Sequence, residues 1–200
     1  MEAISILQPS SVLDVGCGNG KYGYMCREML EISKGLNVRI DAIEVFPEYI
    51  KDIHHNIYDN IYIQEAINAL GEMSDQSYDL ILAIDVLEHF SKEDGHRFLD
   101  ELLRVGQNII VSTPKLTFTQ DALFGNPYEI HKTEWSAHEL KIAPNIMLKD
   151  KISTIIVLGP GSDTIRSVKR DQIRISIAQF FMKIKRLVFP FSSNNLKKHE

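Results

Sequence analysis

Apolar segments alternate with segments of helical periodicity along the first 115 residues. The run YDLILAI (78–84) is almost entirely apolar, as expected for a strand buried on both faces of a sheet. Strands are predicted at residues 11–15, 38–45, 60–64, 78–84, 107–112 and 152–158. Helices are predicted at residues 21–33, from Pro47 onward, from Ser91 to about Val105, and at 135–141. This alternation predicts an α/β fold with a doubly wound, mostly parallel sheet of six to seven strands and helices on both faces.

A glycine-rich segment, SSVLDVGCGNGKYG, follows directly on the first predicted strand. Residues 18–23 fit the G-x-G-x-x-G pattern of dinucleotide-binding loops, and the overlapping residues 14–20 fit the first motif of methyl-transferring enzymes. Glycines let a cofactor approach the backbone in either case. The carboxylate of Asp14 would repel a pyrophosphate and suits a cationic ligand. S-adenosylmethionine carries a sulfonium, an amino group and a ribose but no phosphate, so Asp14 favours it over NAD(P).

Two further acids follow the next predicted strands. Glu44 ends DAIEV, where a carboxylate can accept hydrogen bonds from ribose hydroxyls, which is equally expected for NAD. Glu65 follows the third predicted strand and can accept from an adenine amino group. A solvated helix start is the alternative interpretation of Glu65, and the sequence does not separate the two.

The segments VLDVGCGNGKYG, IDAIEVFPEYI, YDLILAIDVLEHF and NIIVSTP occur in the order and spacing of class I S-adenosylmethionine-dependent methyltransferases, which the chain resembles over residues 11–115 and less closely to about 160. The resemblance implies a Rossmann-like methyltransferase fold and S-adenosyl-L-methionine as cofactor. It implies that the first-motif acid orients the glycine loop and helps to hold the methionine amino end. The acid ending the second strand would bind ribose, and the end of the fourth strand would line the pocket near the sulfonium. The cofactor-binding positions are then Asp14, Gly16, Gly18, Gly20, Glu44 and Asp85, with Glu65 added from the residues alone.

Methyl transfer needs alignment of the acceptor with the methyl group, and a general base when the acceptor is a hydroxyl. His89 lies just past the fourth predicted strand and is one candidate base; packing or capping of the next helix is its alternative role. Its neighbour Glu88 is expected to be structural.

His131 is the second candidate base, in a loop of about 20 residues that is longer than usual α/β connections. Tyr128 and Trp135 can form an apolar acceptor wall beside it, or the loop can simply fold over the sheet edge. No metal site is expected: Cys17 and Cys26 both lie on or beside the glycine loop and do not form a zinc set, and the adjacent His54 and His55 do not share a helix face.

The charge distribution divides the chain. Residues 164–200 carry nine Lys and Arg against two Asp and Glu, whereas the rest carries 13 basic and 25 acidic residues. We therefore expect a methyltransferase domain at 1–163 and a basic amphipathic segment at 164–200. The excess of acidic residues at 1–163 argues against binding of nucleic acid, because phosphates need a basic surface. Residues 171–189 are predicted to form a helix that docks on the domain or a partner subunit, or that lies on an anionic membrane.

We predict a cytoplasmic location, because the chain has only two cysteines, no signal-peptide pattern and no long apolar run. The basic segment adds peripheral contact with a membrane as a second expectation. The predicted function is methyl transfer to a small-molecule or glycan/lipid-linked acceptor, with O-, C- or N-methylation left open. The alternatives are an NAD(P)-binding oxidoreductase and a non-catalytic methyltransferase-like binding protein.

Overall fold

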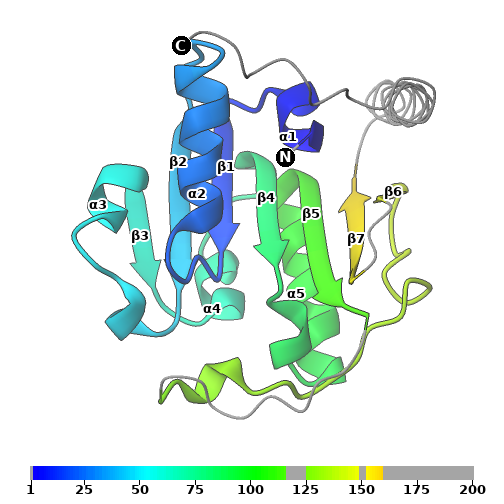
Figure 1. The fold of residues 1–200 in the computed structure, drawn as a ribbon. Coiled ribbons are helices and arrows are strands. Elements are labelled where there is room, and N and C mark those ends of the chain that lie inside the picture. Colours follow the sequence, from blue (N-terminus) through cyan, green and yellow to red (C-terminus); the bar gives the residue numbers. More distant parts are fainter. Residues whose placement is uncertain (1, 116–124, 149–151, 160–200) are drawn as a thin grey trace, which may run out of the picture.

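The computed structural model describes residues 2–115, 125–148 and 152–159, so the predicted segment 164–200, its helix at 171–189 and the domain boundary before it lie outside the described residues. A seven-stranded sheet forms the centre of the fold, in the order β3-β2-β1-β4-β5-β7-β6 (Figure 1). The first five strands are parallel. The strands are β1 (Ser11–Val15), β2 (Arg39–Glu44), β3 (Asn60–Ile63), β4 (Tyr78–Ile84), β5 (Gly106–Pro114), β6 (Asn145–Leu148) and β7 (Ser153–Leu158).

Helices cover both faces of the sheet, as the alternation predicts. On one face, α2 (Lys21–Cys26) and the π-helical turn η1 (Arg27–Ile32) that continues it pack over Val12, Ile40 and Leu80. On the other face, α4 (Ala66–Gly71) and α5 (Lys92–Val105) pack over the neighbouring residues Leu13 and Ile81. Successive strand residues therefore point into opposite cores, which is why the buried strands are apolar throughout.

The carboxyl ends of the parallel strands lie at one end of the sheet, and the segment 125–135 crosses beneath them (Figure 1). The short helix α1 (Glu2–Leu7) lies at the opposite end of the sheet, so it does not cover these carboxyl ends. Within the described residues, no helix combines the length and apolarity needed to cross a membrane.

The prediction of a helix from Pro47 onward is wrong, because the structure has two short elements there instead of one helix. Pro47–Tyr49 forms a single 3₁₀ turn (η2), and a separate short helix, α3, covers His54–Ile57. The interruption has a local cause, because the N–H of Lys51 donates to Nδ1 of His54 at 3.0 Å instead of to a backbone carbonyl. The side chain thus replaces one helical hydrogen bond and restarts the helix at His54.

The antiparallel side of the sheet contains one strand that the sequence does not predict, β6, which has only four residues and pairs with β7. The helix predicted at 135–141 is also wrong: residues 137–140 form a turn. Both the N–H and the hydroxyl of Ser136 donate to Glu139, at 2.8 and 2.7 Å, and Glu139 pairs with Lys92 of α5 at 2.6 Å. These side-chain contacts hold the segment against α5 in a non-helical form.

We predict that Gly95→Ala lowers the free energy of unfolding by about 1–2 kcal/mol, although alanine favours a helix by about 1 kcal/mol. The reason is that a Cβ at Gly95 would lie 2.3 Å from Cζ2 of the buried Trp135. Gly71→Ala in α4 is the matched control, since nothing lies within 4 Å of its Cβ position, and it should be neutral or stabilising. Urea unfolding of both variants measures the difference, and a Gly95→Ala variant as stable as Gly71→Ala would contradict it.

Candidate active site

A cavity of about 340 Å³ opens at the carboxyl ends of the parallel strands. The glycine loop, the ends of β2 and β4, the start of α4 and the segment 126–132 line it. Its acidic lining residues are Glu44, Glu65, Asp85, Asp94 and Glu129, and its basic ones are Arg97 and Lys132. The excess of carboxylates makes the cavity attractive to a cationic ligand. A more open hollow of about 670 Å³ adjoins it between α4 and α5, away from the glycine loop.

The glycine loop takes backbone conformations that other residues rarely adopt. Gly16, Gly18 and Gly20 have φ values of 69°, 51° and 79°. A Cβ at Gly16 would lie 2.7 Å from the side chain of Val86, so the loop packs directly on the turn after β4. Gly18 faces open space instead and lines the cavity, which leaves its backbone accessible to a ligand.

Gly18 is held from both sides. Its N–H donates to Oε2 of Glu44 at 2.9 Å, and its carbonyl oxygen lies 2.9 Å from Nε2 of His54. Because the N–H of Lys51 donates to Nδ1 of His54, the remaining nitrogen Nε2 is the one that donates to Gly18. Glu44 also accepts the N–H of Phe46 at 2.9 Å, and burial raises its pKa. The sequence offers His54 only as a rejected metal ligand, so its contact with the loop is a feature that sequence reasoning misses.

Asp14 lies behind the loop rather than in the cavity. Its side chain is 1% exposed, and its Oδ2 accepts the N–H of Gly23 at 3.0 Å and the hydroxyl of Tyr58 at 2.7 Å. Burial raises the pKa of Asp14 to about 6, although these two hydrogen bonds favour the carboxylate. Gly23 is in α2, so Asp14 joins the end of β1 to the start of the helix and thereby orients the loop between them.

Asp85 forms the corner at the end of β4. Its φ of 56° is unusual for a residue with a side chain, and aspartate is among the residues that tolerate it best. Its backbone N–H donates to the carbonyl of Ser112 at 3.0 Å, and the Ser112 hydroxyl donates to its Oδ1 at 2.5 Å. Glu65 is exposed at the N-cap of α4, makes no side-chain capping bond and lines the cavity, so its role in binding adenine stays a prediction.

The segment 125–135 closes one side of the cavity and is bonded to the turn η3 (Leu87–His89). The N–H of Lys132 donates to the carbonyl of Glu88 at 2.9 Å, and the indole N–H of Trp135 donates to that of Leu87 at 3.2 Å. Trp135 is 3% exposed and belongs to the hydrophobic core, so the interpretation that its side chain contacts the methyl acceptor is wrong. Tyr128 does line the cavity.

The fold brings the two candidate bases together. The rings of His89 and His131 have centroids 5.1 Å apart and are tilted by 58°. Glu88 lies beside them, 3% exposed, and neither of its carboxylate oxygens has a hydrogen-bond partner among the described residues. Burial raises the pKa of Glu88 to about 7 and lowers that of His89. His89 lines the cavity, so this cluster adjoins it.

We predict that the buried carboxyl of Asp14 makes the protein lose stability as pH rises from about 4 to 6. The unfolded chain releases this proton near the ordinary value of 3.8, whereas the folded chain keeps it to about pH 6. The loss approaches roughly 3 kcal/mol and is complete above pH 6. Asp14→Asn keeps an oxygen for both donors but cannot titrate, so its stability relative to the natural protein should rise across this interval. Urea unfolding at pH 4 and pH 7 measures it, and a constant difference would rule the effect out.

Residues 12–108 match the family model described as a methyltransferase domain. A small RNA 2'-O-methyltransferase of Tetrahymena thermophila is 30% identical over 126 residues, which cover 58% of this chain and 28% of that protein. A ubiquinone biosynthesis O-methyltransferase of Glaesserella parasuis is 26% identical over 110 residues, covering 48% of this chain and 47% of that protein. The matches thus span less than half the length of each of these curated relatives.

Solved structures share the fold. The bifunctional kinase-methyltransferase WbdD superposes with a TM-score of 0.57 at 15% identity, covering 78% of this chain and 38% of that one. A SAM-dependent methyltransferase of Aquifex aeolicus gives a TM-score of 0.51 at 21% identity, covering 74% and 82%. With the glycine loop and the acids at the strand ends, the match over residues 12–108 shows that the chain carries a domain of the class I S-adenosylmethionine-dependent methyltransferase family.

Proposed function

We propose that this chain transfers a methyl group from S-adenosylmethionine to an oxygen atom of a small-molecule or glycan/lipid-linked acceptor. The observation that carries the proposal is the acidic cavity at the glycine loop, with five carboxylates against two basic side chains in its lining. Such a cavity favours a cationic cofactor and repels a pyrophosphate, which supports S-adenosylmethionine over NAD(P).

The residues at the loop end of the cavity fit the cofactor. Gly18 leaves open space beside its backbone, where a nucleoside can approach. Glu44 ends β2 beside that space, and carboxylate oxygens there can accept from ribose hydroxyls while they hold Gly18 and Phe46. Asp85, at the corner after β4, contributes negative charge where the family places the sulfonium. Asp14 acts as a positioning residue, through Gly23 and Tyr58.

The cofactor supplies a methyl group already activated by its positive sulfur, so the protein has to align the acceptor and keep water away. The segment 125–135 provides the acceptor side, with Tyr128 and Lys132 lining the cavity and His89 beside them. An imidazole at this position can take the proton of an acceptor hydroxyl. This arrangement supports an enzyme over a non-catalytic binding protein.

Oxygen is proposed as the acceptor atom because the curated relatives described above are named O-methyltransferases, although their acceptors differ. The excess of acidic residues before position 164 argues against a nucleic-acid acceptor, since binding to phosphates needs a basic surface. A small or carrier-linked acceptor therefore remains the proposal.

We expect Glu44→Gln to weaken binding of S-adenosylhomocysteine about 10- to 100-fold, because the amide loses charged hydrogen bonds to the ribose and to the loop. Glu48→Gln is the matched control: Glu48 is exposed on η2, four residues further on. Calorimetric titration with S-adenosylmethionine, S-adenosylhomocysteine and NAD tests the proposal in one series. Tight binding of NAD without either methionine derivative would overturn the proposed function.

The paired histidines of α3 give a second test. His54→Ala removes the donor to the Gly18 carbonyl and should weaken binding of S-adenosylhomocysteine about fivefold, since one hydrogen bond contributes about 1 kcal/mol. His55→Ala removes an exposed imidazole from the same helix and should leave the affinity unchanged. Equal affinities of the two variants in the same titration would show that His54 does not position the loop.

A further inference from the structure

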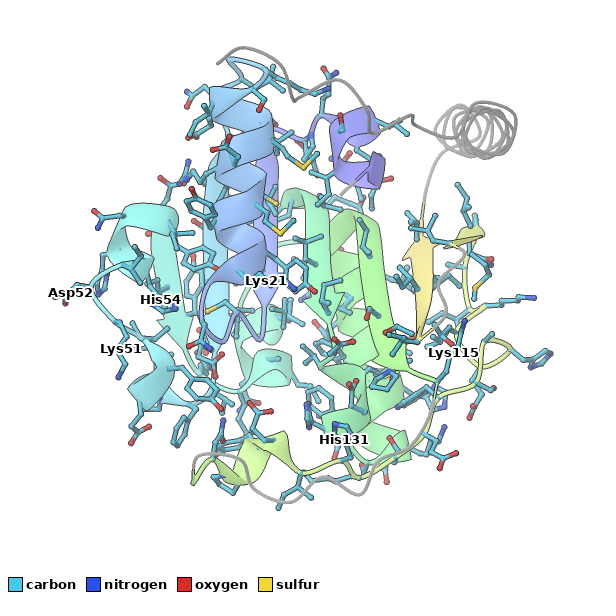
Figure 2. All side chains as sticks on the ribbon, viewed as in Figure 1. Lys21, Lys51, Asp52, His54, Lys115 and His131 are labelled. Atoms are coloured by element: carbon cyan, nitrogen blue, oxygen red, sulfur yellow. The ribbon has the colours of Figure 1, made fainter. Side chains whose placement is uncertain are left out.

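We propose that Glu129 is the residue that distinguishes S-adenosylmethionine from its demethylated product, because its carboxylate faces the positive sulfur of the methyl donor. The inference rests on the proposed function, since it assigns a role to another residue of the same cavity. Sequence patterns do not single out Glu129, which lies in the long connection after the fifth strand. Figure 2 shows His131, two residues further along the segment 125–135, beneath the carboxyl ends of the strands.

A hydrogen bond fixes the carboxylate of Glu129 on the cofactor side of the cavity. The hydroxyl of Tyr49 donates to its Oε1 at 2.9 Å, although the two residues are 80 positions apart in the chain. Tyr49 is the last residue of η2, which follows β2 and its terminal acid Glu44, and all three side chains line the cavity. Glu129 itself is half-buried. The segment 125–135 is thus joined to the turn after β2 as well as to η3.

The charge of Glu129 acts on groups at the ends of two different strands. Burial raises the pKa of Glu44, at the end of β2, and the charge of Glu129 raises it further. Burial also raises the pKa of Glu88, which follows β4, to about 7, and the charges of Asp85 and Glu129 contribute. In the sheet, β1 lies between β2 and β4. A side chain that acts on both therefore lies near the end of β1, where the strand order reverses and α/β folds bind their ligands.

The direction in which the cofactor has to cross the cavity brings its sulfur to the same place. On the proposed function, the nucleoside lies at Gly18 and Glu44. The methyl group has to face the acceptor, on the side lined by the segment 125–135 and His89. The sulfur links the nucleoside to the methyl group, so it lies between Glu44 and this segment. A carboxylate there attracts a sulfonium, and the attraction is stronger where the walls of the cavity exclude water.

Methyl transfer removes the charge that Glu129 attracts. The methyl carbon exchanges its bond to sulfur for a bond to the acceptor oxygen, the sulfur keeps the electron pair of the broken bond, and the acceptor proton passes to His89. S-adenosylhomocysteine then carries a neutral sulfur, although its nucleoside still contacts Gly18 and Glu44. Glu129 therefore favours the methyl donor over the product, and it does so through charge alone.

Calorimetric titration of the full chain with S-adenosylmethionine and with S-adenosylhomocysteine measures this effect without any knowledge of the acceptor. Glu129→Gln should weaken binding of S-adenosylmethionine about tenfold and leave that of S-adenosylhomocysteine unchanged. Glutamine keeps an oxygen that can accept the hydroxyl of Tyr49, so the position of the segment is preserved. Glu134→Gln is the matched control, since Glu134 is an exposed residue of the same segment and is not among the residues that line the cavity. It should keep both affinities of the natural protein.

A double-mutant cycle tests the hydrogen bond that positions the carboxylate. Tyr49→Phe should lower the preference for S-adenosylmethionine about threefold, and it should have no further effect on that preference in the Glu129→Gln background. Equal effects of Tyr49→Phe in both backgrounds would show that the hydroxyl does not act through Glu129.

The outcomes for Glu129→Gln separate this inference from the proposed function. If the variant loses affinity for both forms of the cofactor equally, or keeps both affinities, the assignment of Glu129 to the sulfur is overturned. If the natural protein binds neither form, the proposed function itself is refuted.

Discussion

One buried carboxyl group, that of Asp14, holds together the elements that shape the site. Its Oδ2 receives a hydrogen bond from the backbone of α2 and another from Tyr58, the residue that follows α3. Since β1 carries Asp14, this single atom sets the angle at which the chain leaves the central sheet and enters the helix. Glu44 and His54 then hold the middle of the loop at Gly18. The cavity wall on the cofactor side is therefore made of backbone whose position depends on buried side chains.

Elements specified by their own residues follow the sequence closely. The apolar run of β4 and the strand β1 have the predicted bounds, and α5 begins after Ser91, whose hydroxyl accepts the N–H of Asp94 at 3.1 Å. The elements that differ are those specified from elsewhere in the chain. The helix after Pro47 is interrupted by His54, and the segment after Trp135 is held by its contacts with α5. Short-range patterns cannot show such contacts.

The residues of the site likewise fall into those that the sequence predicts and those that it does not. Glu44, Asp85 and two loop glycines, Gly16 and Gly18, line the cavity, because parallel strands end at one edge and the acids that end them meet there. The expectation that Asp14 touches the ligand depended on which way its side chain turns, and Tyr58 and Gly23 decide that. The proximity of His89 and His131 could not be predicted either, since a long connection separates them and only tertiary packing brings them to 5.1 Å.

The manner in which the segment 125–135 is attached makes it tolerant of side-chain replacement. Most of its links to η3 end on main-chain carbonyls, those of Leu87, Glu88 and Phe90 on one side and that of Ile130 on the other. A residue keeps its carbonyl oxygen whatever its side chain. Tyr128 and Lys132 can therefore be replaced without loss of the hydrogen bonds between the segment 125–135 and η3. Substitutions at these positions can therefore change the lining of the cavity while the hydrogen bonds that hold the segment 125–135 in place stay as they are.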